Sequence, residues 1–126
     1  MVEFAIVLPF FALLLLGMID FGLALHSRGL VGNAAREAAR LGAVGATPTA
    51  METHARGVAG SLDQSDLTIT VTCTKPDSSP CSFSPSTIAP GDAVVVRVDY
   101  DYGLLSPLVF ASSVRVSSTA HMRYEG

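Results

Sequence analysis

The sequence predicts an α+β fold in which one long apolar helix carries a small domain made of a second helix and an antiparallel sheet. Three observations predict it: residues 1–25 are almost entirely apolar, residues 27–62 follow helical spacing, and three later segments alternate apolar and polar residues. The 126 residues suffice for one spanning segment and one small domain. We therefore divide the chain into residues 1–25, the apolar helix, and residues 26–126, the α+β domain.

The N-terminal segment is long and apolar on every side. Residues 4–19 contain no charged residue, and the apolar character continues to Leu25. A helix over residues 4–25 would be about 33 Å long, which is enough to cross a hydrocarbon core of about 30 Å. A cleaved signal peptide would begin with basic residues and be shorter, and a buried core helix would need more apolar surface than the rest of the chain offers. We therefore expect a retained transmembrane or filament-core helix.

Three residues interrupt the apolar pattern of this segment. Glu3 lies at its outer edge and Asp20 near its far end, and a carboxylate within hydrocarbon costs roughly 2.5–3.5 kcal/mol. Both are explained if they lie at the two boundaries of the span. For Glu3 a second interpretation stays open, in which it pairs with the N-terminal amine of an adjacent subunit. Pro9 removes a helical hydrogen bond, so we expect a kink or local melting over residues 5–9.

The first helix is predicted to continue into the domain over residues 27–42, which are rich in alanine. We therefore expect a single helix of about forty residues, with its upper half amphipathic against the domain. A second helix is predicted over residues 49–62. Its N-cap is either Thr49, in a capping box, or Thr47, with a proline at the first helical position.

Strands are predicted over residues 67–73, 93–102 and 114–124, where apolar and polar residues alternate. The simplest assembly is a three-stranded antiparallel sheet packed on the amphipathic helices. An apolar connection joins the second and third strands. In the second strand one face is shared by Val94, Val96, Val98, Tyr100 and Tyr102. In the third strand the residues expected to face inward are Val114, Val116, Ser118, Ala120, Met122 and Tyr124.

Two cysteines, Cys73 and Cys81, flank a polar and turn-forming stretch. The chain has no Cys-x2-Cys pair and no histidine close to these cysteines, so a zinc site is not favoured. A disulfide that closes a small loop is the preferred interpretation, and it requires an oxidising compartment. Two unpaired thiols in a flexible loop are the alternative.

Composition and spacing argue against several functions. The net charge is −3 and Lys75 is the only lysine, so we expect no nucleic-acid partner. The histidines lie in different predicted elements, and no nucleophile elbow or phosphate-binding glycine loop is present. Asp99 and Asp101 share one strand face, where they could serve as an acid–base pair or calcium ligands, but solvated charges neutralised by Arg97 are the preferred interpretation. We expect no catalytic residue, no cofactor and no metal.

The segments MVEFAIVLPFFALLLLGMIDFG and NAAREAARLGA together resemble the N-terminus of the TadE-like family, the minor pilins or pseudopilins of the tight-adherence (Flp) pilus system. Towards the C-terminus, VVVRVDYDYGLLSPLVF and VRVSSTAHMRYE resemble the last two strands of that family and the connection between them. The resemblance implies a pilin-like fold and a structural or assembly subunit that acts in surface attachment or pilus biogenesis.

The resemblance also implies partners, placement and site residues. The partners are membrane lipid, other pilin subunits or further copies of this chain, the pilus assembly machinery, and the prepilin peptidase that removes a short basic leader. The chain would cross the cytoplasmic membrane once, with its C-terminal domain outside, and would enter a filament at the cell surface after assembly. The family's matching Glu is normally the fifth mature residue, whereas Glu3 is third here. The candidate subunit-assembly residues are Glu3, Phe4, Pro9 and Asp20.

Two other functions stay open. A membrane-anchored binding module that does not polymerise would contact its ligand through the loop over residues 74–91 or through the connection over residues 104–110. A membrane-bound enzyme is the other, but the sequence nominates no residue for it.

Overall fold

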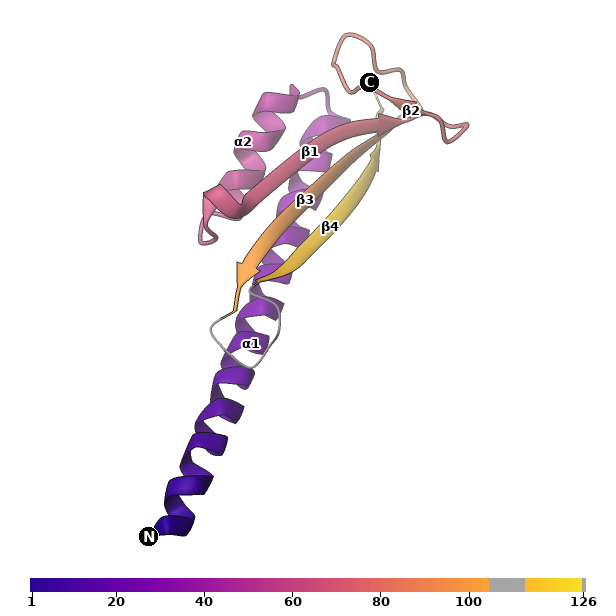
Figure 1. Ribbon diagram of the computed structural model, residues 1–126. Helices are drawn as coiled ribbons and strands as arrows, with labels where there is room; N and C mark the ends of the chain where they lie inside the picture. Colours follow the sequence, from indigo (N-terminus) through magenta and orange to yellow (C-terminus); the bar gives the residue numbers. More distant parts are fainter. Residues whose placement is uncertain (105–112, 126) are drawn as a thin grey trace.

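The computed structural model describes residues 1–104 and 113–125 (Figure 1). The elements run α1 (Val2–Ala43), α2 (Pro48–Val58), a 3-10 turn η1 (Gln64–Asp66), β1 (Leu67–Thr74), β2 (Pro80–Cys81), β3 (Ala93–Gly103) and β4 (Ser113–Arg123). The sheet lies across the upper half of α1 with α2 beside it, while the lower half of α1 projects alone to the N-terminus (Figure 1). The expected α+β fold with a long apolar helix is confirmed.

Helix α1 is continuous over 42 residues, so the predicted apolar and amphipathic helices are one element. It continues through Pro9 in helical conformation, so of the kink or local melting expected over residues 5–9 the melting does not occur. Its C-terminus is a Schellman motif: the Ala46 amide donates to the Leu41 carbonyl at 3.1 Å, and the Gly45 amide donates to the Gly42 carbonyl at 3.0 Å. Gly45 has a φ of +90°, which a residue with a Cβ rarely adopts.

Helix α2 is capped by Thr47, whose side-chain oxygen accepts from the Ala50 amide at 3.2 Å, with Pro48 at the first helical position. Of the two N-caps considered, the structure therefore has Thr47. The expected end near residue 62 was wrong, because α2 ends at Val58. Two glycines, Gly57 and Gly60, make continued helix costly in backbone entropy at this point.

The sheet has four antiparallel strands in the order β2-β1-β3-β4, so the expected three-stranded sheet was one strand short. The additional strand, β2, has two residues and no alternation of its own, so no periodic pattern could predict it. Proline is tolerated there because β2 is an edge strand. The three longer strands were predicted to within one residue at each end.

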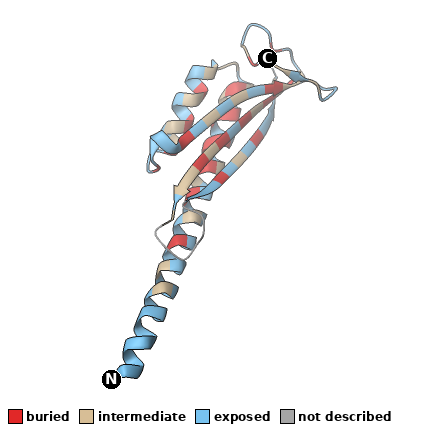
Figure 2. Cartoon of the chain, viewed as in Figure 1, coloured by how far each residue is buried: buried red, intermediate tan, exposed pale blue. Residues whose placement is uncertain are grey.

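The core forms where small side chains of α1 meet the central strand β3. Val94, Val96 and Val98 have no exposed surface, as expected from their alternation (Figure 2). The α1 residues that face them are fully buried and small, which lets the helix approach the sheet closely: Val31, Ala34, Ala35, Ala38 and Ala39.

Strand β4 follows its predicted inward face only along its middle. Val116 and Ala120 are buried, but Val114 remains 41% and Met122 36% exposed. Because strands twist and α1 does not follow that twist, the two elements separate towards the strand ends. A groove opens at each end, one lined by Val114 and the other by Met122.

Candidate functional site

The lower half of α1 is an apolar surface that no other described part of the chain covers along most of its length. An 18-residue window of this helix has a mean hydropathy of 2.5, and none of it is buried inside the chain. Figure 2 shows this half exposed along almost its whole length. Exposed apolar patches of such size are rare on soluble monomers and indicate contact with lipid or with another protein. The large exposed side chains include Phe4, Ile6, Leu8, Phe10, Phe11, Met18 and Ile19.

Three of the predicted assembly residues lie at the free end of this surface. Phe4 is 75% exposed, and Glu3 and Pro9 are also exposed. All three lie on one exposed stretch of α1 below the domain, and among the described residues the structure brings none of them against another element. Their role in assembly stays a prediction, and it depends on groups that a neighbour would supply.

Asp20, the fourth predicted assembly residue, has a different environment. Only 5% of it is exposed, and the hydroxyl of Tyr102 on β3 donates a hydrogen bond of 3.4 Å to its Oδ1. Desolvation raises the pKa of Tyr102, and the adjacent Asp20 carboxylate adds to that effect. Tyr102, at the lower end of the sheet, therefore contacts this carboxylate. From hydropathy alone, Asp20 is interpreted only as a residue at the boundary of the span.

The loop between Cys73 and Cys81, at the upper end of the domain, is held by a disulfide and by hydrogen bonds within it. Cys73 and Cys81 are direct partners across β1 and β2, with Cα atoms 5.0 Å apart, and a disulfide joins them. Within the loop, the Asp77 carboxylate accepts from the amide and hydroxyl of Ser79 at 3.0 and 2.6 Å, which lowers the pKa of Asp77. The preferred interpretation of the cysteines is thereby confirmed. The second segment considered for ligand contact, residues 104–110, lies outside the described residues from residue 105 onward.

The polar face of the sheet carries two ion pairs. Arg97 donates to Asp99 at 3.1 Å, as expected, and Arg115 of β4 donates to Asp101 at 2.9 Å. Arg115 lowers the pKa of Asp101 through that hydrogen bond. Sequence reasoning missed this pairing because it depends on the register of β3 and β4. Across residues 1–104 and 113–125, no group of three or more His, Cys, Asp or Glu side chains is placed to hold a metal ion.

These features define a class of protein, in which a single N-terminal apolar helix of membrane-spanning length continues directly into a small α+β domain. The family model described as TadE-like protein matches residues 1–40, which is nearly the whole of α1, and this is the family that the sequence resembles. The match associates the chain with the Tad pilus, and the apolar helix is consistent with a membrane anchor. No curated protein and no solved structure matches the chain.

Proposed function

We propose that the chain is a minor pilin or pseudopilin of a tight-adherence-type pilus, a structural or assembly subunit that acts in surface attachment or in pilus biogenesis. The observation that supports this most is the uncovered apolar half of α1, continuous with an upper half that packs on the sheet. A large apolar side chain gains roughly 1.5–3 kcal/mol when it is fully buried. The exposed residues of this helix therefore favour lipid before assembly and neighbouring helices within a filament.

In this proposal Glu3 sets the position of the subunit in the filament. It is exposed at the free end of α1, beside apolar side chains such as Phe4. A carboxylate among packed apolar helices needs a cationic partner to offset its desolvation. The N-terminal amine of a neighbouring subunit would supply that charge. Pro9 and Phe4 would shape the same contact surface.

Asp20 has a different part in the proposal. Because the sheet covers it within its own chain, it would act in assembly by fixing the domain on α1. The partners by this proposal are membrane lipid, other pilin subunits or copies of the same chain, a prepilin peptidase and the assembly machinery. The domain would lie outside the cytoplasmic membrane, where an oxidising environment maintains the disulfide.

We further propose that the chain acts without catalysis, cofactor or metal. Asp99 and Asp101 are the carboxylates that sequence spacing brought together, and each is bound by an arginine. The hydrogen bond from Arg115 lowers the pKa of Asp101 and therefore opposes a role for that carboxylate as a proton donor at neutral pH.

The test is fractionation of cells that express the native gene, with membranes, sheared surface filaments and medium each blotted for the chain. Recovery in sheared filaments together with other pilins is the expected result. A cytoplasmic-membrane protein blotted in parallel controls for contamination by membrane fragments. Recovery in membranes alone, in cells that do make pili, would refute a filament subunit and favour an anchored binding module or an assembly-only role.

A further inference from the structure

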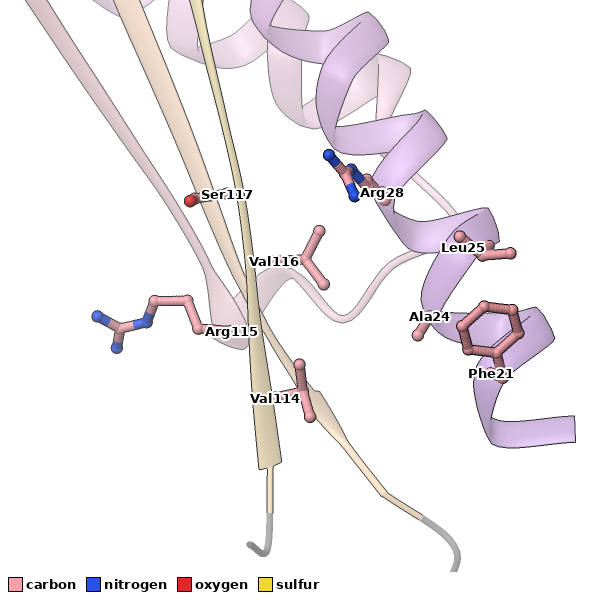
Figure 3. A pocket seen from close by; sticks show the side chains of 8 residues that line it. All are labelled: Phe21, Ala24, Leu25, Arg28, Val114, Arg115, Val116 and Ser117. Carbon is pink, nitrogen blue, oxygen red and sulfur yellow. The ribbon is translucent and has the colours of Figure 1, made fainter. Parts of the chain in front are cut away.

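A groove opens between α1 and the first residues of β4, at the lower end of the domain (Figure 3). Its volume is about 320 Å³. Val114 and Val116 point from the strand towards the helix, and the guanidinium of Arg28 extends into the space between helix and strand (Figure 3). The groove therefore has apolar walls and a cationic group at one end. Its lining consists of Phe21, Ala24, Leu25, Arg28, Val114, Arg115, Val116 and Ser117.

The two arginines of the groove differ in whether a carboxylate among the described residues neutralises their charge. Arg115 turns to the opposite side of β4 (Figure 3) and binds both oxygens of Asp101, at 2.9 and 3.3 Å. Arg28 is exposed, and within residues 1–104 and 113–125 it forms no side-chain hydrogen bond or ion pair. The groove thus presents one cation whose charge no described residue neutralises, next to an apolar wall.

The position of the groove along α1 matches the surface of a membrane. Residues 4–19 carry no charge, and Asp20 is the first residue of α1 that is buried. A carboxylate within hydrocarbon costs roughly 2.5–3.5 kcal/mol, so Asp20 favours a position at the end of the apolar span. The lower end of the domain must therefore approach the headgroups when the helix spans the bilayer, and Arg28 lies two turns beyond Asp20 on the same helix.

We propose that this groove binds one anionic phospholipid, with the phosphate on Arg28 and the upper part of an acyl chain against Phe21, Leu25 and Val114. The proposal rests on the membrane placement in the proposed function and names a specific ligand there. Basic pockets beside spanning helices are suited to anionic headgroups. The volume of the groove is at the small end of the range for small-molecule sites, which suits one lipid headgroup with part of its acyl chain.

The test titrates the full chain, purified in a mild detergent, with phosphatidylglycerol or with phosphatidylcholine of the same acyl chains, and counts bound lipid by native mass spectrometry. Wild-type protein should prefer phosphatidylglycerol. Arg28→Gln should weaken phosphatidylglycerol binding about fivefold, whereas Arg28→Lys should retain most of it. Arg40→Gln is the matched control, because Arg40 is an exposed arginine of the same helix away from the groove, and it should bind like wild type.

Further arms separate the possible occupants. Inorganic phosphate added in excess should not displace the lipid, because phosphate cannot replace the contacts between the acyl chain and the apolar half of the site. Val114→Ser should weaken both lipids, since Val114 is proposed to contact the acyl chain. Equal binding of the two lipids, an equal effect of Arg28→Gln and Arg40→Gln, or displacement by phosphate alone would overturn the proposal.

A dimer that Arg28→Gln dissociates, with lipid binding unchanged, would identify a second copy as the occupant and would also overturn it. If the lipid test fails and the chain is still recovered in sheared filaments, only the lipid site is refuted. If the chain is absent from filaments and lipid binding persists, the proposed subunit role fails by itself.

Discussion

The close packing of α1 on the domain predicts that Gly42→Ala destabilises the fold. Gly42 is buried near the end of α1. A Cβ at this position would lie 2.5 Å from Met51 Cε and 2.7 Å from Val94 Cγ1. Both neighbours are fully buried, so at least one of them must move.

The magnitude follows from two opposing terms. Overpacking a well-packed core lowers stability by about 1–3 kcal/mol. Gly→Ala in helical conformation raises stability by about 0.4–1 kcal/mol, because it reduces the conformational entropy of the unfolded chain. Met51 can adjust because its side chain is flexible, but Val94 is β-branched and lies within the central strand. We expect a net loss of about 1–2 kcal/mol in the free energy of unfolding.

The chain offers a matched control in Gly57→Ala. Gly57 is the next-to-last residue of α2, as Gly42 is of α1, and a Cβ there would meet nothing within 4 Å. Gly57→Ala should leave the free energy of unfolding unchanged or raise it slightly, because alanine stabilises the helix there without a steric clash. Urea unfolding of the full chain in a mild detergent, followed by tyrosine fluorescence, measures both variants. The sequence has three tyrosines and no tryptophan.

Equal stability of the two variants would refute the packing of α1 against Met51 and Val94. A double-mutant cycle tests the same contact from the other side. In a Met51→Ala background, the space vacated by the methionine should reduce the cost of Gly42→Ala by at least about 0.5 kcal/mol. An unchanged cost would assign the destabilisation to some other contact.

Three further predictions concern the disulfide, the base of the sheet and the filament. Replacing Cys73 and Cys81 together by Ala should lower the free energy of unfolding by about 2–3 kcal/mol, the loop-closure value for this short loop; wild-type protein with a reductant should shift equally, and no shift in urea unfolding would contradict the role of the bond. Tyr102→Phe should lower stability by about 1–2 kcal/mol, because Asp20 loses a hydrogen bond while remaining buried. Since the folded-state pKa of Tyr102 is raised above 10.0, its contribution is complete below that pH and lost as pH rises through the folded pKa; wild type should therefore lose stability above pH 10 relative to Tyr102→Phe, and parallel pH profiles would contradict this. Glu3→Ala should leave the chain in the membrane and reduce its amount in sheared filaments, whereas Glu37→Ala, at an exposed position higher on the same helix, should not; normal incorporation of Glu3→Ala would refute its assembly role.

Most of the fold was predictable because it follows local periodicity. Alanine-rich sequence predicted the continuation of α1, and alternation predicted β1, β3 and β4. Two of the misses, β2 and the end of α2, have no such pattern. Strand β2 exists because the disulfide holds Cys81 opposite Cys73 on β1, and a pairing of that kind is a tertiary constraint that two residues cannot signal by themselves.

The candidate site divides in the same way. The uncovered apolar half of α1 was predictable because hydropathy depends on composition, whereas the environment of Asp20 was not. Its partner Tyr102 is 82 residues away in the sequence, and only the antiparallel register places that tyrosine at the lower end of the sheet. This contact has a functional consequence: because the sheet reaches down to Asp20, the domain lies against one face of the last turns of the apolar segment, while Phe21 and Leu25 remain exposed. The groove beside Arg28 lies at the same end of the sheet, because Val114 of β4, which lines it, pairs with Tyr102 of β3.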